Sequence, residues 1–152
     1  MFKKKLGHKS VPNNKTGVLP YQNLVSFVKN GVILADKEIE DNQIQPASID
    51  LRLGQKAWRM QASFLPGPKQ AVEDRVKDFC LHEIDLRNGA LLERGCVYLV
   101  PLLEALDLPQ ELRGVANPKS STGRLDIFTR LITDGAVDFD IVRRGYCGPL
   151  YA

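Results

Sequence analysis

Six consecutive residues carry side chains that suit the binding of an anion. They contain two cations, three hydroxyl groups and a glycine, and they are Lys119, Ser120, Ser121, Thr122, Gly123 and Arg124. Hydroxyl groups and backbone N–H groups in a tight turn form a concave donor surface for an anion. Lys119 adds a point charge, and the planar guanidinium of Arg124 suits two hydrogen bonds to one phosphate. The same composition is equally typical of a solvated loop, so these residues alone predict an anion site and nothing more specific.

The spacing of apolar residues indicates which elements must position this segment. Pro118 favours an extended conformation at Asn117, which predicts that the segment follows a strand. Apolar and polar side chains alternate over residues 49–53, as expected of a half-buried strand. Residues 96–100 are a short apolar run and predict a buried strand. Many short strands separated by Gly and Pro predict a mainly β fold, either a barrel or a sandwich.

Helical spacing is clearest before residue 45. Residues 21–30 place apolar side chains at positions i, i+3 and i+4, and Gly31 follows where a C-terminal cap belongs. We therefore expect a short amphipathic helix there. The charged residues 71–79 are either a second short helix or an insertion between strands, and residues 125–133 are either a short helix or a strand.

Two motifs in the chain resemble the dCTP deaminase family, a branch of the dUTPase-like superfamily. Residues 117–126 are similar to the family's Arg-Ser-Ser-x-x-Arg triphosphate loop, with Lys119 in place of the leading arginine. Residues 45–54 are similar to the Gln-Pro-x-Ser-x-Asp-Leu-x-Leu-Gly strand that opens the family's barrel. From Gly17 onward the chain resembles the first half of the long, two-module form. The resemblance implies a distorted β-barrel of the dUTPase-like type with a few short helices.

The resemblance also implies a reaction, the hydrolytic deamination of dCTP to dUTP and ammonia on the route to dUMP and dTTP. In the family, a glutamate after a Gly-(Trp/Tyr)-x-Gly turn activates the water that attacks C4 of cytosine. That turn corresponds to residues 145–148, so the glutamate would fall immediately after Ala152. No residue of the sequence takes the catalytic position. We therefore expect residues 17–152 to be an incomplete, truncated domain with little activity by itself.

Further site residues follow from the same resemblance. The six residues of the triphosphate loop would bind the nucleotide, and Asp138 would face the deoxyribose, with Asp134 as a rival. Tyr151 and Ala152 belong to the strand whose backbone recognises the edge of the base. Asp50 is expected to be structural. The family implies Mg²⁺ bound through the triphosphate, and a homotrimer or pseudo-trimer with sites shared between subunits.

Two alternative functions stay open. One is dUTP pyrophosphatase or a bifunctional deaminase–pyrophosphatase, which would also bind dUTP or dTTP. The other is a catalytically inactive nucleotide-binding or assembly module, because the general base is not among the residues present. Zinc is not expected, since zinc deaminases carry H-x-E and P-C-x-x-C motifs. Here His82 and Glu83 are adjacent, and the three cysteines lie far apart and are expected to be reduced and mostly buried, at Cys80, Cys96 and Cys147.

Charge and hydropathy exclude several classes of protein. The net charge is +3, but residues 1–15 contain five lysines and no acid, which leaves −2 for residues 16–152. A basic tail on a slightly acidic domain is not typical of a nucleic-acid-binding fold. No apolar run approaches the ~20 residues that span a bilayer, and no signal peptide is evident. We expect a flexible basic tail over residues 1–16, one domain over residues 17–152, a cytoplasmic location, and neither a nucleic-acid nor a membrane partner.

Overall fold

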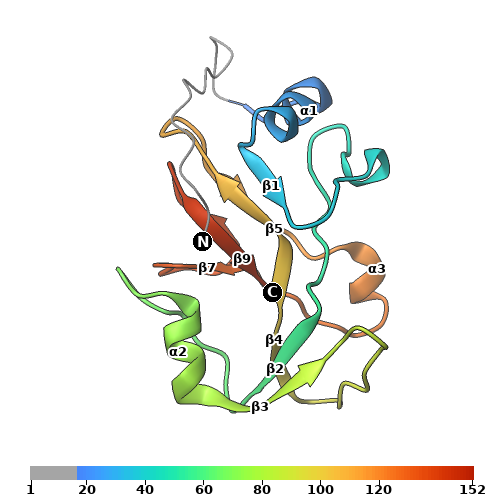
Figure 1. The fold of residues 1–152 in the computed structure, drawn as a ribbon, viewed down its shortest axis with the longest axis vertical. Helices are drawn as coiled ribbons and strands as arrows, with labels where there is room; N and C mark the ends of the chain where they lie inside the picture. Colours follow the sequence, from blue (N-terminus) through green and yellow to red (C-terminus); the bar gives the residue numbers. More distant parts are fainter. Residues whose placement is uncertain (1–16) are drawn as a thin grey trace.

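Three antiparallel sheets organise residues 17–152, the part of the chain that the computed structural model describes (Figure 1). The largest sheet has the strand order β1 (Ile33–Ala35), β5 (Pro101–Asp107), β9 (Cys147–Tyr151) and β7 (Ile132–Thr133). The second has the order β3 (Cys80–Asp85), β2 (Lys56–Met60) and β4 (Val97–Leu99), and the third pairs β6 (Gly114–Val115) with β8 (Ile141–Val142). The predicted mainly β class is confirmed. The sheets remain separate and do not close within residues 17–152, and the predicted tail over residues 1–16 lies outside the described residues.

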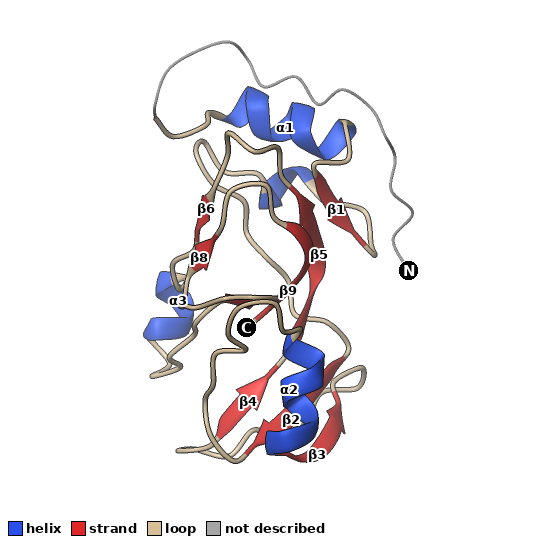
Figure 2. Cartoon of the chain, turned by 90° about the vertical axis from the view of Figure 1, so that its left-hand side faces the viewer, coloured by secondary structure: helices blue, strands red, loops and turns tan. Residues whose placement is uncertain are grey.

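The helices are short and few, as predicted (Figure 2). They are α1 (Tyr21–Lys29), a 3-10 turn (Asp41–Gln43), α2 (Val72–Phe79) and α3 (Ser120–Gly123). None of the helices in residues 17–152 has the length and apolar character needed to cross a membrane.

Helix α1 confirms the expectation from its apolar spacing. Leu24 and Phe27 are buried and pack against Val32 and Ile33, the start of β1. The helix ends because Gly31 adopts a left-handed φ of +66°. That conformation lets Val32 N donate to Phe27 O at 2.9 Å and Gly31 N donate to Val28 O at 3.2 Å, a pattern that satisfies the last carbonyls of a helix.

Helix α2 resolves the two alternatives for residues 71–79 in favour of a helix. Val72 and Val76 are buried against Trp58 and Met60 of β2, so one face of the helix covers the three-stranded sheet (Figure 2). Two acids occupy its first turn, which suits the positive end of the helix dipole. Packing on the sheet therefore places the first turn of α2 beside the largest sheet.

Strand β9 lies between β5 and β7 and has two differently covered faces. Its Leu150 packs with Leu131, Val142 and Tyr146, in the cluster that Ala116 also joins. The next residue, Tyr151, instead packs in the cluster of Trp58 and Val72. Because successive side chains of a strand point to opposite faces, β9 separates the two regions in which the candidate site residues lie.

The prediction of a regular strand over residues 49–53 is wrong. The segment is extended but makes only isolated bridges, at Ile49 with Ile44 and at Leu53 with Leu102. Its backbone hydrogen bonds go to several partners: Asp50 N donates to Gln43 O, and Arg52 N donates to a carboxylate oxygen of Glu104, each at 2.8 Å. A continuous β-ladder cannot form there, because the Glu104 carboxylate accepts the hydrogen bond that a backbone carbonyl of a neighbouring strand would otherwise accept. The run over residues 96–100 does contain a strand, β4.

Two further expectations differ from the structure. Residues 125–131 are irregular, and only Ile132–Thr133 of the predicted helix or strand is regular. The cysteines are not mostly buried. Cys80 and Cys96 are half-buried free thiols, and Cys147, which begins β9, is exposed.

Candidate functional site

The predicted anion-binding segment forms an exposed turn that follows a strand, as expected. Strand β6 pairs with β8, and Ala116 N extends the pairing by donating to Asp140 O at 2.8 Å. The single turn of α3 follows, where Thr122 Oγ1 donates to the carbonyl of Lys119 at 2.6 Å. Thr122 is half-buried, and the other members are exposed, namely Lys119, Ser120, Ser121, Gly123 and Arg124. The cations and the two serines are thus open to a ligand from solvent.

One ion pair joins this turn to the other motif, residues 45–54. Nζ of Lys119 lies 2.5 Å from Oδ2 of Asp50, and the two side chains are 62% and 30% exposed. Asp50 is fixed because its own backbone N–H donates to Gln43. An ion pair this exposed contributes about 0–1 kcal/mol to stability, so Lys119 can leave Asp50 for a phosphate at little cost. The expected structural role of Asp50 is therefore to hold the side chain of Lys119.

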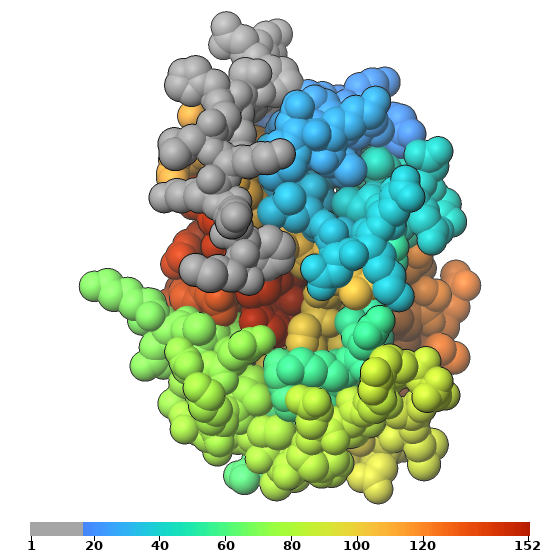
Figure 3. Space-filling view, viewed as in Figure 1, coloured from blue at the N-terminus to red at the C-terminus, as the bar shows by residue number. Residues whose placement is uncertain are grey.

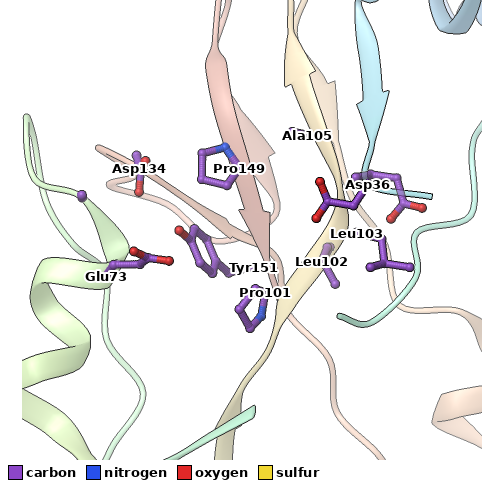
Figure 4. A pocket seen from close by; sticks show the side chains of 11 residues that line it. Asp36, Glu73, Pro101, Leu102, Leu103, Ala105, Asp134, Pro149 and Tyr151 are labelled. Carbon is purple, nitrogen blue, oxygen red and sulfur yellow. The ribbon is translucent and has the colours of Figure 1, made fainter. Parts of the chain in front are cut away.

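A second candidate region is a cavity of about 420 Å³ on the other side of β9. It is a hollow on the face seen in Figure 3, between α2 and β1. Its lining, seen from close by in Figure 4, comes from β5, β9, the first turn of α2 and the residues that follow β1 and β7. The lining residues are Asp36, Ala71, Glu73, Pro101, Leu102, Leu103, Glu104, Ala105, Asp134, Pro149 and Tyr151. Four carboxylic acids and no basic residue line this cavity, which we call the Tyr151 pocket.

The structure places Asp134 and Asp138, the two candidates for contact with the deoxyribose, in different surroundings. Asp134 lines the Tyr151 pocket, whereas Asp138 is exposed and does not line it. Asp134 is held in place because its Oδ1 accepts a hydrogen bond from Val72 N at 2.8 Å, at the start of α2. Of the predicted site residues, the fold therefore brings Tyr151 together with Asp134 and leaves Asp138 apart. Ala152 is fixed by two hydrogen bonds with Val100, from N to O in each direction, at 2.8 and 2.9 Å.

Burial keeps the tyrosines of this region protonated. Burial raises the pKa of Tyr151 well above its usual value, and the nearby carboxylates of Glu73 and Asp134 raise it further. Burial likewise raises the pKa of Tyr146. A phenol normally ionises near pH ~10. Tyr151 therefore presents a neutral hydroxyl to the pocket at physiological pH.

The triphosphate-loop residues and the Tyr151 pocket do not face each other within one chain. Ala116, which leads into α3, packs with Leu150 on one face of β9, and Tyr151 points to the opposite face. Figure 1 accordingly shows α3 and α2 on opposite sides of the β5–β9 pair. One chain thus presents two separate candidate regions, a cationic turn and an acidic pocket.

Sequence reasoning missed Glu73 and Asp36 as lining residues of the pocket. Glu73 belongs to a charged helix whose docking depends on the burial of Val72 and Val76, and no local motif marks it. Asp36 follows β1, a strand too short for its period to be recognised. Within residues 17–152, no group of three or more His, Cys, Asp or Glu residues is arranged to hold a metal ion.

Known proteins resemble this chain in sequence and fold. The crystal structure of 2'-deoxycytidine 5'-triphosphate deaminase from Agrobacterium tumefaciens matches with a TM-score of 0.88 and 51% identity, covering 91% of this chain and 40% of that chain. The dCTP deaminase of Halorubrum lacusprofundi is 34% identical over 100 residues, which are 64% of this chain and 48% of the relative. The dUMP-forming dCTP deaminase of Halobacterium salinarum is 27% identical over 124 residues, 80% of this chain and 63% of the relative.

The match is confined to one part of these proteins. The chain spans about half the length of the first two curated relatives, 48% and 45%. Residues 15–152 match the model of the 2'-deoxycytidine 5'-triphosphate deaminase N-terminal domain. With a family model over nearly the whole sequence and a closely similar dUTPase-like fold, this chain belongs to the dCTP deaminase family.

Proposed function

We propose that this chain binds the triphosphate of dCTP and serves its hydrolytic deamination to dUTP and ammonia. The observation that carries the proposal is the exposed turn of hydroxyls and cations at the family's triphosphate-loop position, in a chain of that family. Ser120 and Ser121 donate hydroxyl hydrogens to phosphate oxygens. Arg124 contributes a two-pronged contact, and Lys119 a point charge.

Mg²⁺ accompanies the nucleotide in this proposal. The turn contains no carboxylate, the side chain that most often binds Mg²⁺, and its N–H groups and cations are donors for phosphate oxygens. The oxygens of the triphosphate would therefore hold the ion, which would neutralise part of the nucleotide charge, while the residues of the turn orient the phosphates.

The reaction needs a general base next to C4 of cytosine. The family resemblance places a glutamate directly after Ala152, and a strand puts every second side chain on the same face. Continued along β9, that glutamate lies on the face of Tyr151. It takes a proton from water as the water oxygen bonds to C4, and the proton is delivered to the amino nitrogen. The C4–N bond then breaks and releases ammonia, and the second proton of the water passes to N3 as the C4 carbonyl forms.

We further propose a homotrimer or pseudo-trimer whose sites are shared between subunits. The two candidate regions on opposite faces of β9 support sharing, because a single chain does not bring them together. Exposed apolar side chains directly after α3 support assembly, since a contiguous apolar patch commonly marks an interface. They are Leu125, Ile127 and Phe128, with exposed fractions of 72%, 52% and 80%. A cytoplasmic location follows from a substrate drawn from the nucleotide pool.

Binding and turnover should be measured together. The chain should bind Mg·dCTP in calorimetry, and Arg124→Ala should weaken binding by about 1.5–3 kcal/mol, the worth of a charge-assisted hydrogen bond. Arg94→Ala, at another exposed arginine, is the matched control and should leave affinity unchanged. Equal dissociation constants for Arg124→Ala and the control would remove the turn from the site.

Turnover separates the deaminase from its alternatives. A chain carrying glutamate after Ala152 should release ammonia from dCTP, and glutamine there should lower the rate by about 10²–10⁴-fold. Pyrophosphate release from dCTP or dUTP would identify the bifunctional activity. Binding without ammonia release by the glutamate-bearing chain would favour a non-catalytic module.

A further inference from the structure

Helix α2 begins without a capping side chain from its own segment. Ala71 occupies the N-cap position, and its methyl group cannot accept a hydrogen bond. The first N–H groups of a helix have no acceptor within the helix. Val72 N instead donates to Oδ1 of Asp134, which is 2.8 Å away and 62 residues further along the chain. Because a Ser, Thr, Asn or Asp at the N-cap normally supplies this acceptor, Asp134 caps the helix from outside.

The backbone next to Asp134 holds the segment that leads into α2. Gly135 N donates to Gln70 O at 2.8 Å, and Gly67 N donates to Ala136 O at 3.1 Å. Together with the cap, three hydrogen bonds therefore join the turn after β7 to the start of the helix. Isolated helices as short as the eight residues of α2 are marginal in water, so the position of α2 depends on such contacts and on its packing.

Asp134 is itself fixed to the largest sheet. It directly follows β7, which pairs with β9, and its backbone N donates to the hydroxyl of Tyr146 at 3.3 Å. The backbone of Asp134 is thus held by the sheet, while its side chain reaches α2. Figure 4 shows Asp134 and Glu73, from the first turn of α2, on the same side of the Tyr151 pocket. Asp134 is therefore placed to set the distance between α2 and the sheet at this pocket.

We infer that Asp134 is a positioning residue, which fixes the first turn of α2 and with it the wall of the Tyr151 pocket that Ala71 and Glu73 form. This role requires an acceptor oxygen at residue 134 and no negative charge. It differs from the contact with deoxyribose for which Asp134 was a candidate. Its consequence for nucleotide binding rests on the proposed function, which puts the expected glutamate on the same face of β9.

Substitutions at residue 134 separate the two roles. Asp134→Asn retains a carbonyl oxygen that can accept from Val72 N, whereas Asp134→Ala removes the acceptor. One net hydrogen bond corresponds to a factor of roughly three to ten in an equilibrium constant. We therefore expect Asp134→Ala to weaken dCTP binding by roughly three- to tenfold and Asp134→Asn to leave it within about twofold.

The test uses the whole chain, with Asp74→Asn as the control on the same helix. Asp74 does not line the pocket and pairs with Lys77 at 3.2 Å. Amide hydrogen exchange followed by NMR reports whether Val72 N keeps its acceptor. Calorimetry gives the dissociation constants of dCTP and of 2',3'-dideoxycytidine triphosphate, which lacks the 3'-hydroxyl. Asp134→Ala should lose the exchange protection of Val72 N and bind dCTP more weakly, whereas both asparagine variants should resemble the unaltered chain.

Direct contact with the deoxyribose predicts a different result. If Asp134 bound the 3'-hydroxyl, Asp134→Asn would reduce the preference for dCTP over its dideoxy analogue. A reduced preference in that variant, or an unchanged dCTP affinity in a folded Asp134→Ala chain, would refute the inference. If circular dichroism shows that Asp134→Ala does not fold, Asp134→Asn decides alone. Unchanged exchange protection, affinity and preference then support the inference, and weaker dCTP binding refutes it.

The proposed function fails separately. If the unaltered chain binds dCTP and Arg124→Ala weakens that binding, but Asp134→Ala does not, the proposed function stands and the inference is refuted. If the unaltered chain binds neither nucleotide, the proposed function is refuted together with the consequence for binding. Exchange at Val72 N in the ligand-free chain then still decides whether Asp134 holds α2.

Discussion

Replacing Glu104 by alanine would remove one buried carboxylate that holds the extended segment over residues 49–53. The Glu104 side chain is fully buried in β5. Its Oε1 accepts from Arg52 Nε at 2.8 Å and from Gln43 Nε2 at 3.1 Å, and its Oε2 accepts from Arg52 N at 2.8 Å. The change therefore strips three donors of their acceptor at once.

The expected loss of stability follows from what those donors retain. Breaking a buried ion pair by removing one partner costs about 3–5 kcal/mol, because the remaining charge is left uncompensated. Arg52 is 24% exposed, and its guanidinium keeps the carbonyls of Lys37 and Glu38 at 3.0 and 2.9 Å. Because Arg52 keeps these two partners and some contact with solvent, we expect the loss of stability to lie at the low end of this range, about 3 kcal/mol. For a domain of this size, that corresponds to a fall in the melting temperature of roughly 6–12 °C.

Denaturant unfolding provides the measurement, followed by the fluorescence of Trp58, the one tryptophan of the chain. Trp58 is 7% exposed and packs beneath α2, so it reports global unfolding. Glu111→Ala, at an exposed glutamate, is the control and should shift stability by no more than about 0.5 kcal/mol. The double change Glu104→Leu with Arg52→Met should cost less than Glu104→Ala, since it leaves no buried charge. A loss of about 1 kcal/mol or less in Glu104→Ala, one third of the expected loss, would refute the role assigned to this carboxylate.

Three further outcomes are expected. Tyr146→Phe should lower the free energy of unfolding by about 1–3 kcal/mol, because it leaves Asp134 N without an acceptor. Tyr151→Phe should cost close to nothing. Equal losses of the two variants in urea titrations would contradict the stabilising role of the Tyr146 hydrogen bond. Burial raises the pKa of Tyr146 and Tyr151, so the stability that their neutral form contributes is fully present below the unfolded-state pKa of about 10 and is lost as the pH rises above it. Denaturant midpoints should therefore fall above about pH 10. They should fall less in the variant that carries both Tyr146→Phe and Tyr151→Phe. Lys119→Ala should change stability by less than about 1 kcal/mol, because its ion pair is exposed; calorimetric melting checks this, and a larger loss would mean that the pair supports the fold.

An element of the fold could be predicted where the residues that stabilise it all lie in one continuous segment. Residues 21–31 contain both the apolar spacing and the terminal glycine that predict helix α1, and the structure has the helix and the left-handed glycine. Residues 49–53 show the limit of such reasoning, because alternation is the same for a paired strand and for an extended segment. Which of the two forms depends on Glu104, whose carboxylate takes the place of a neighbouring backbone. That partner lies 52 residues away and has no local signal.

One part of the candidate site could be predicted from a continuous segment of sequence, and the other part could not. The turn over residues 119–124 could be recognised from its side-chain types, because donors for a phosphate are consecutive there. The Tyr151 pocket could not, because its acids come from α2 and from the residues after β1 and β7, which only tertiary packing brings together. The choice between Asp134 and Asp138 likewise depended on where α2 docks, since Val72 N binds Asp134.

The position of β9 in its sheet has a consequence for how the protein is made. Strand β5 precedes β9 by about forty residues, and β9 lies between β5 and β7, so the centre of the sheet is completed by the last of its strands to be synthesised. Until β9 emerges from the ribosome, β5 and β7 each present an unpaired edge that another nascent chain can join. Sheets built from distant segments also form slowly, because the connecting loop must close before any contact is gained. A delay before β9 has emerged should therefore favour aggregation, whereas a delay after β9 has paired with β5 and β7 should not.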